Sequence, residues 1–78
     1  MAERRMFSKS VVNNDTFLDL PPIVRCLYFQ LCIEADDDGF NGKAKSTTRM
    51  VGATSKDLDQ LIDYGFIIRF PNGVVVDA

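Results

Sequence analysis

Basic residues gather in the middle of this chain, in a stretch that contains no acidic residue. Residues 39–56 hold four lysines and arginines and no aspartate or glutamate: Lys43, Lys45, Arg49 and Lys56. The net charge of the whole chain is −2, so this stretch is a local positive patch on an acidic molecule. Cationic side chains gathered in this way are suited to contact backbone phosphates. The alternative is an ordinary charged face in water.

No catalytic or metal-binding constellation is recognisable. The chain has no histidine, no Gly-rich phosphate loop and no cysteine paired with a base, so we expect no enzymatic activity and no cofactor. The acidic run from Asp36 to Asp38 has part of the spacing of a calcium loop. However, Lys45 falls where such a loop needs a bidentate glutamate. We therefore expect a turn there, no bound metal, and a binding module.

The positive patch overlaps a predicted helix-turn-helix over residues 44–65. After a Gly-Ala-Thr break, apolar residues recur at the i, i+3, i+4 spacing of an amphipathic helix: Leu58, Leu61 and Ile62. Thr54 or Ser55 is suited to cap this second helix, and Gly65 is suited to end it. Two short helices joined by a tight turn that contains glycine are typical of a helix-turn-helix.

Residues 66–77 predict a β-hairpin directly after the helix pair. The run FIIRF, the turn residues PNG and the run VVV follow one another, and Asn72-Gly73 suits a type I′ turn. Phe40-Asn41 suits the short strand that precedes the helix pair in winged folds. We therefore expect an α+β winged helix-turn-helix with a small helical core and a C-terminal hairpin wing. The alternative is a small α+β core whose helix pair has no role in binding nucleic acid.

The rest of the chain completes one domain over residues 1–78, because 78 residues are too few for two cores. Residues 1–10 are a basic arm or an edge strand. We expect a short helix through Phe17 and Leu18. A longer helix runs from Pro21 or Pro22 to about Ala35, since proline is tolerated at the first helical position.

The longer helix carries two apolar stripes. The first consists of Leu20, Val24, Leu27, Tyr28, Leu31 and Ala35, and the second of Ile23, Cys26, Phe29 and Ile33. A helix that is apolar on two sides is either central in its domain or uses one side for a partner. In so small a domain we expect internal burial of both stripes, with self-association through the second as the alternative.

The location expected from the sequence is the cytoplasm. Cys26 and Cys32 are about 9 Å apart along a helix axis, too far for a disulfide, which indicates a reducing environment. No apolar run is long enough for a membrane span, and the N-terminus lacks the apolar block of a signal peptide.

Blocks of sequence along nearly the whole chain fit one known pattern. They are RRMFSKSVV, DTFLDLP, LYFQL, EADDDGF, RMVGA, DLDQLI and GFIIRF with GVVV, in this order. In these blocks the chain resembles the N-terminal domain of phage replisome organisers, the replication-initiation proteins of phages of low-GC Gram-positive bacteria. The resemblance implies a winged-helix domain related to the N-terminal domain of the bacterial primosomal protein DnaD.

The resemblance also implies partners and a cellular place. It implies double-stranded phage origin DNA and self-association, with host replication proteins bound through a further C-terminal region, in the cytoplasm of a bacterial host. One departure is local. Relatives have a proline and a basic pair before an apolar residue, where this chain has Ala44-Lys45-Ser46-Thr47. One basic residue is thus missing, and Thr47 replaces an apolar side chain.

In a winged helix the second helix of the pair usually enters the major groove. Its first turn would meet phosphate, Gln60 would read adenine, and the first helix, the wing and the N-terminal arm would hold the backbone. The DNA-binding residues expected on this basis are Lys43, Lys45, Arg49, Ser55, Lys56, Gln60, Arg69, Asn72, Arg4 and Arg5.

Two other functions stay open from the sequence. Asp59 and Asp63 lie on the same outward side of the second helix and would repel phosphates. This acidity favours a protein-interaction or oligomerisation module of the replication machinery with little affinity for DNA. A phage transcriptional regulator would have the same binding chemistry in a different genomic role.

Overall fold

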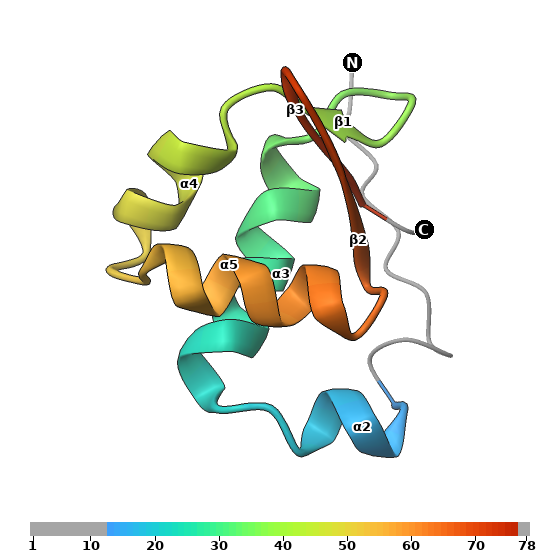
Figure 1. The fold of residues 1–78 in the computed structure, drawn as a ribbon, viewed down its shortest axis with the longest axis vertical. Coiled ribbons are helices and arrows are strands. Elements are labelled where there is room, and N and C mark those ends of the chain that lie inside the picture. The colour runs from blue at the N-terminus through green and yellow to red at the C-terminus, as the bar shows by residue number, and fades with distance from the viewer. Residues whose placement is uncertain (1–12, 77–78) are drawn as a thin grey trace.

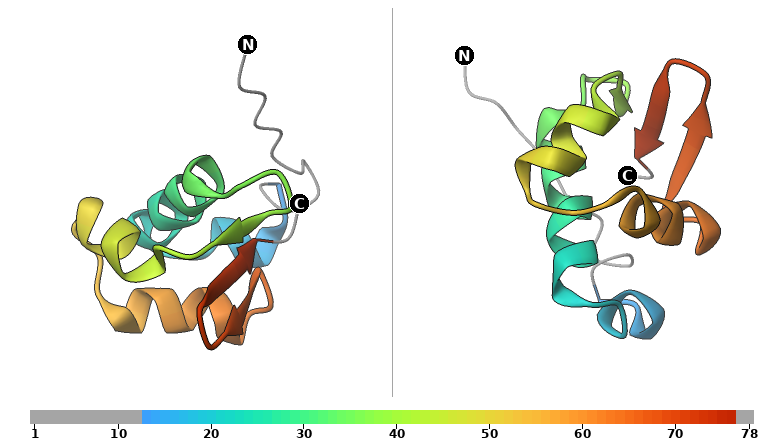
Figure 2. Two further views of the ribbon diagram at one scale, coloured as in Figure 1. Left: turned by 90° about the horizontal axis from the view of Figure 1, so that it is seen from above. Right: turned by 60° about the vertical axis from the view of Figure 1, so that its left-hand side comes forward.

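Helix α3 (Pro22–Glu34) lies at the centre of the structure, a computed structural model in which residues 13–76 are described. The other elements are arranged around it (Figure 1): α2 (Asp15–Leu18), β1 (Phe40–Asn41), α4 (Ala44–Met50), α5 (Ser55–Asp63), β2 (Ile67–Phe70) and β3 (Gly73–Val76). α4 and α5 both pack on α3, and the hairpin of β2 and β3 stands at one end of α5 (Figures 1 and 2).

The three strands form one antiparallel sheet in the order β1-β3-β2. Phe40 on β1 is opposite Val75 on β3, which is opposite Ile68 on β2. Four helices with a three-stranded antiparallel sheet over the described residues confirm the predicted α+β class. The short helix, the long helix, the short strand, the helix pair and the hairpin all occur where the sequence predicted them.

The ends of α5 follow from local sequence signals. Thr54, not Ser55, is the N-cap: its hydroxyl oxygen accepts a hydrogen bond from the backbone N–H of Asp57. The Asp57 carboxylate accepts in return from the backbone N–H of Thr54 at 2.9 Å, which completes a capping box. At the other end Gly65 has a φ of 82°, as predicted, and the N–H of Phe66 donates to the carbonyl of Leu61.

The first stripe of α3 forms the centre of the core. All six residues of the predicted stripe are buried, which confirms it: four lie within α3, and Leu20 and Ala35 lie just outside its ends. They pack against side chains of α2, α5 and the sheet. Phe17 of α2 meets Tyr28 and Phe66 edge to face, with ring centroids 5.3 and 5.4 Å apart. One continuous core therefore holds α2, the helix pair and the hairpin against α3.

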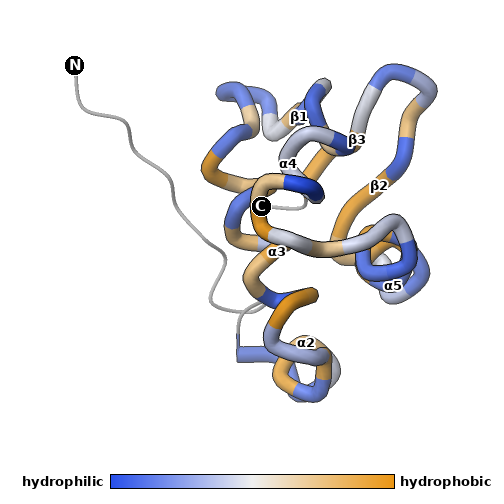
Figure 3. Tube along the Cα trace, turned by 90° about the vertical axis from the view of Figure 1, so that its left-hand side faces the viewer, coloured by the Kyte–Doolittle hydropathy of each residue, from blue (hydrophilic) through white to orange (hydrophobic). Residues whose placement is uncertain are grey.

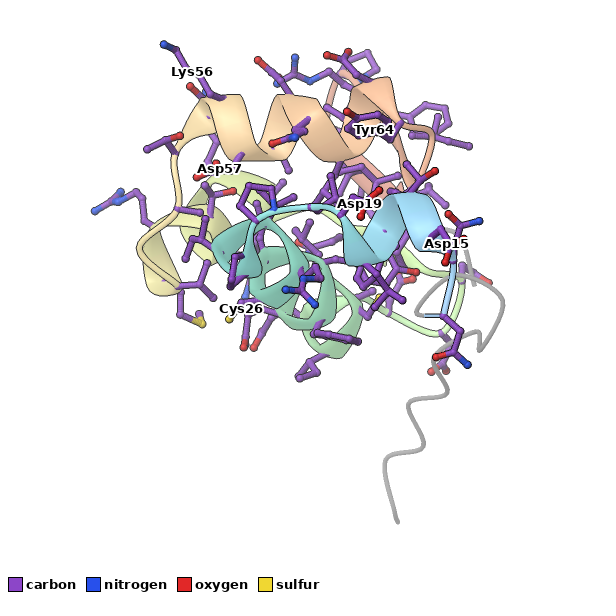
Figure 4. All side chains as sticks on the ribbon, turned by 90° about the horizontal axis from the view of Figure 1, so that it is seen from below. Asp15, Asp19, Cys26, Lys56, Asp57 and Tyr64 are labelled. Carbon is purple, nitrogen blue, oxygen red and sulfur yellow. The ribbon has the colours of Figure 1, made fainter. Side chains whose placement is uncertain are left out.

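The predicted internal burial of the second stripe is wrong for two of its four residues. Cys26 and Ile33 are exposed, the latter at 47%, while Ile23 and Phe29 are partly buried against the core. The physical reason is the small size of the domain. The elements that pack on α3 cover the side of the helix that bears the first stripe, which leaves Cys26 and Ile33 exposed to solvent. Cys26 lies on the opposite side of α3 from α5 (Figure 4).

The hairpin turn also differs from its prediction. Phe70 is paired with Gly73, so the two loop residues are Pro71 and Asn72, and Gly73 belongs to β3. A type I′ turn needs positive φ at both loop residues, whereas every positive φ in the described chain belongs to a glycine. Gly73 also lies close to β1: a Cβ added there would collide with the carbonyl oxygen of Asn41, so only glycine fits this position.

Candidate nucleic-acid interface

A groove of about 320 Å³ lies between the start of α4 and the tip of the β2–β3 hairpin. We call it the wing groove, and its lining residues are Gly42, Lys43, Ala44, Lys45, Ser46, Leu58, Arg69, Phe70, Pro71, Asn72, Gly73 and Val74. Three of these residues are cationic and none is acidic. Lys43, Lys45 and Arg69 are all exposed, so their charges are available to an anion that enters the groove.

Asn41 fixes the α4 side of the wing groove. Its side chain is 1% exposed, and its Nδ2 donates to the carbonyl oxygen of Leu31 at 3.2 Å. That carbonyl is left over at the end of α3, where the N–H of Ala35 donates to Cys32 instead. Asn41 Oδ1 accepts from the N–H of Lys43 at 2.7 Å. One buried amide thus ties the segment that bears Lys43 to the central helix.

The hairpin side of the wing groove is tied to α5. Arg69 lies on the face of β2 that is turned toward the helices, and its Nη1 is 3.8 Å from Oδ1 of Asp59. Both side chains are more than half exposed, so the pair contributes little stability in water. The pair places Arg69 between the basic wing groove and the acidic side chains of α5.

The outer face of α5 is chemically different from the wing groove. A shallow hollow there is lined by Lys56, Asp59, Gln60, Asp63 and Tyr64, which include two carboxylates and one ammonium group. The trace of α5 is largely hydrophilic (Figure 3), and Lys56 projects from its N-terminal end (Figure 4). A face with this charge repels phosphate more than it attracts it.

The residues predicted to contact DNA therefore fall into separate groups. Lys43, Lys45, Arg69 and Asn72 come together in the wing groove. Ser55, Lys56 and Gln60 lie on α5, where Gln60 is partly buried and the other two are exposed. Arg49 lines a different shallow hollow on α4. Arg4 and Arg5, with the rest of the predicted arm, lie outside the described residues.

Sequence reasoning missed Ser46, Phe70 and Pro71 as parts of the groove lining. In the run FIIRF apolar residues occupy both faces of the strand, so alternation does not show that Phe70 remains 46% exposed. Thr47 is 1% exposed, and its hydroxyl oxygen accepts from Nδ2 of Asn41 at 3.5 Å. It fills a core position and belongs to no binding surface.

Searches against known protein families, curated proteins and solved structures found no match for this chain. Within residues 13–76, no group of three or more His, Cys, Asp or Glu side chains is placed to hold a metal ion. The acidic run forms the predicted turn, in which Oδ1 of Asp36 accepts from the N–H groups of Asp38 and Phe40, both at 2.9 Å. None of the described helices has the length and apolar character needed to cross a membrane.

Proposed function

We propose that this protein is a winged-helix DNA-binding domain and that the wing groove holds the DNA backbone. The order of helix, strand, helix pair and hairpin, with strands arranged β1-β3-β2, supports this fold. The observation that carries the function is the wing groove itself. It brings Lys43 and Lys45 together with Arg69, from segments far apart in sequence, without any acidic residue in its lining.

The resemblance to phage replisome organisers supports a role in replication initiation, with double-stranded origin DNA as the ligand. In this proposal Lys43 and Lys45 at the start of α4 and Arg69 on the hairpin hold phosphates, while Gln60 of α5 reads a base. Three phosphate contacts are few, and Asp59 and Asp63 oppose them. We therefore expect weak binding, with a dissociation constant on the order of micromolar or higher at physiological salt. Self-association and host replication proteins in the bacterial cytoplasm are further proposed partners.

Two double variants with the same charge change test the site. Lys43→Ala with Lys45→Ala removes two cations from the wing groove, and Arg49→Ala with Lys56→Ala removes two exposed cations elsewhere. Each phosphate contact lowers the logarithm of the association constant by roughly 0.9 for every tenfold rise in salt concentration. One contact therefore raises the affinity about eightfold at 0.1 M salt compared with 1 M salt. We expect the groove variant to weaken duplex binding about 60-fold, equally for all sequences, and the control variant to weaken it less than about threefold.

Fluorescence anisotropy with a labelled duplex measures both affinities, and thermal melting by circular dichroism checks that both variants are folded. Equal losses in the two variants would show that binding depends on total charge and not on the wing groove. A larger loss in the control would move the site to the outer faces of α4 and α5.

A second candidate function, protein interaction, is favoured by the surface chemistry of α5 and β2. Asp59 and Asp63 make the outer face of α5 acidic, and Ile68 and Tyr64 are each 53% exposed nearby in the chain. Such a surface suits a protein partner with basic and apolar groups better than it suits DNA. Light scattering beside the anisotropy titration separates the two functions. If the protein self-associates as its concentration rises and does not bind duplex DNA at low salt, protein interaction is its function.

A further inference from the structure

Phe70 is an aromatic side chain at the border of the wing groove. It is the last residue of β2, directly before the hairpin loop, and it remains 46% exposed. The rings of Phe17, Tyr28 and Phe66 contact one another in the core, whereas Phe70 has no aromatic partner among the described residues. Phe70 is therefore an exposed aromatic residue that lines the same groove as three cations, and its ring is available to pack against a flat apolar ligand.

The size of the wing groove limits what can enter it. Its volume of about 320 Å³ is at the low end of the range of roughly 300–1,000 Å³ for pockets that hold small ligands. A single nucleotide is in this class, whereas a duplex can only lie across the mouth of the groove. In a duplex the base faces are also already stacked, so they offer nothing to the Phe70 ring.

We propose that the wing groove binds an unpaired nucleotide of DNA, with the base stacked on Phe70 and the flanking phosphates held by Lys43, Lys45 and Arg69. This inference rests on the proposed DNA-binding function and adds a preference for DNA that has single-stranded character. A cationic groove combined with an aromatic platform is the arrangement by which proteins hold single strands without reading sequence. The hairpin supports the platform, because Pro71 fixes the backbone directly after Phe70.

The consequence is a protein that binds open DNA better than closed DNA. A forked duplex offers both a duplex backbone and unpaired bases at the junction, so it should bind more tightly than either a blunt duplex or a single strand of equal length. At a replication origin such a preference would hold a melted segment open once it forms.

Three fluorescently labelled probes test the proposal: a blunt duplex, an oligothymidine strand and a forked duplex, each titrated with wild type, Phe70→Ala and Ile68→Ala. Ile68 is the matched control, because it is an apolar residue on the same strand, is 53% exposed, and does not line the wing groove. We expect Phe70→Ala to weaken binding to the oligothymidine and the fork about 5- to 150-fold, the effect typical of one stacked base. Its binding to the blunt duplex, and all binding by Ile68→Ala, should change less than about twofold.

Phe70→Trp gives an independent readout, because the chain contains no other tryptophan. Stacking of a thymine on the indole should quench its fluorescence with oligothymidine and leave it unchanged with the blunt duplex. Equal effects of Phe70→Ala on all three probes, or an unquenched tryptophan with oligothymidine, would overturn the stacking proposal and leave the wing groove as a duplex site. If the wild type binds no probe even at low salt, the proposed function fails together with it.

Discussion

Leu31→Ala should lower the free energy of unfolding by about 2–5 kcal/mol, the cost of truncating a buried leucine to leave a cavity. Leu31 is 0% exposed on the first stripe of α3, within the cluster that joins this helix to α5 and the sheet. The net stability of a small domain is only about 5–15 kcal/mol. Much of the protein should therefore be unfolded at moderate temperature, which urea denaturation followed by circular dichroism measures.

Cys26→Ala is the matched control for this change. Cys26 lies on the same helix but is exposed, so its truncation should alter the unfolding free energy by no more than about 0.5 kcal/mol. A loss below about 1 kcal/mol for Leu31→Ala would mean that α3 is rotated and that its first stripe does not face the core.

Gly73→Ala should be the other strongly destabilising change, by about 2–4 kcal/mol. Its φ of 157° is one that L side chains rarely adopt, which costs about 1 kcal/mol. The added Cβ would also lie 2.8 Å from Cζ of Phe40 and 2.9 Å from Cα of Gly42. Relieving this overlap pushes the hairpin away from β1 and adds about 1–3 kcal/mol. Because Gly42 and Gly73 both line the wing groove, DNA affinity should fall together with stability.

Gly65→Ala separates the cost of the unfavourable φ from the cost of the steric overlap. Gly65 also has a positive φ, of 82°, but a Cβ there would meet no atom within 4 Å. Only the backbone cost of about 1–2 kcal/mol should appear. If Gly73→Ala costs no more than Gly65→Ala, then the close approach of β3 to β1 does not constrain the protein.

The positions of the elements were predictable because their signals are local. Thr54 and Asp57 specify the start of α5 within one helical turn, and Gly65 specifies its end. The alternation of α3 between buried and exposed sides likewise repeats every three or four residues. Such patterns need no knowledge of the rest of the fold, and they gave the α+β class, the helix pair and the hairpin.

Features that depend on contacts between distant segments were not predictable. Gly73 pairs with Phe70 in the strand and lies against Asn41 and Gly42, which are far before it in sequence, so the Asn-Gly pair predicted the wrong turn. The role of Asn41 depends on a carbonyl left unpaired at the end of α3. Both features involve contacts with atoms of another element, and the local sequence does not show these contacts.

The candidate site shows the same division. The charge pattern identified Lys43 and Lys45, but it did not separate them from Arg49, which lies in another hollow. α4 buries Ala44 together with two threonines, Thr47 and Thr48, so hydropathy gives little indication of which side faces inward. Only the packed structure shows which cations share a groove with Arg69.

The salt dependence of duplex binding tests most directly whether the wing groove holds phosphates. Three contacts, from Lys43, Lys45 and Arg69, predict a slope of about −2.7 for the logarithm of the association constant against the logarithm of salt concentration. Lys43→Ala with Lys45→Ala should reduce the slope to about −0.9, since one contact remains. Arg49→Ala with Lys56→Ala should leave it near −2.7. A wild-type slope near zero, or an unchanged slope in the groove variant, would contradict DNA binding by this groove.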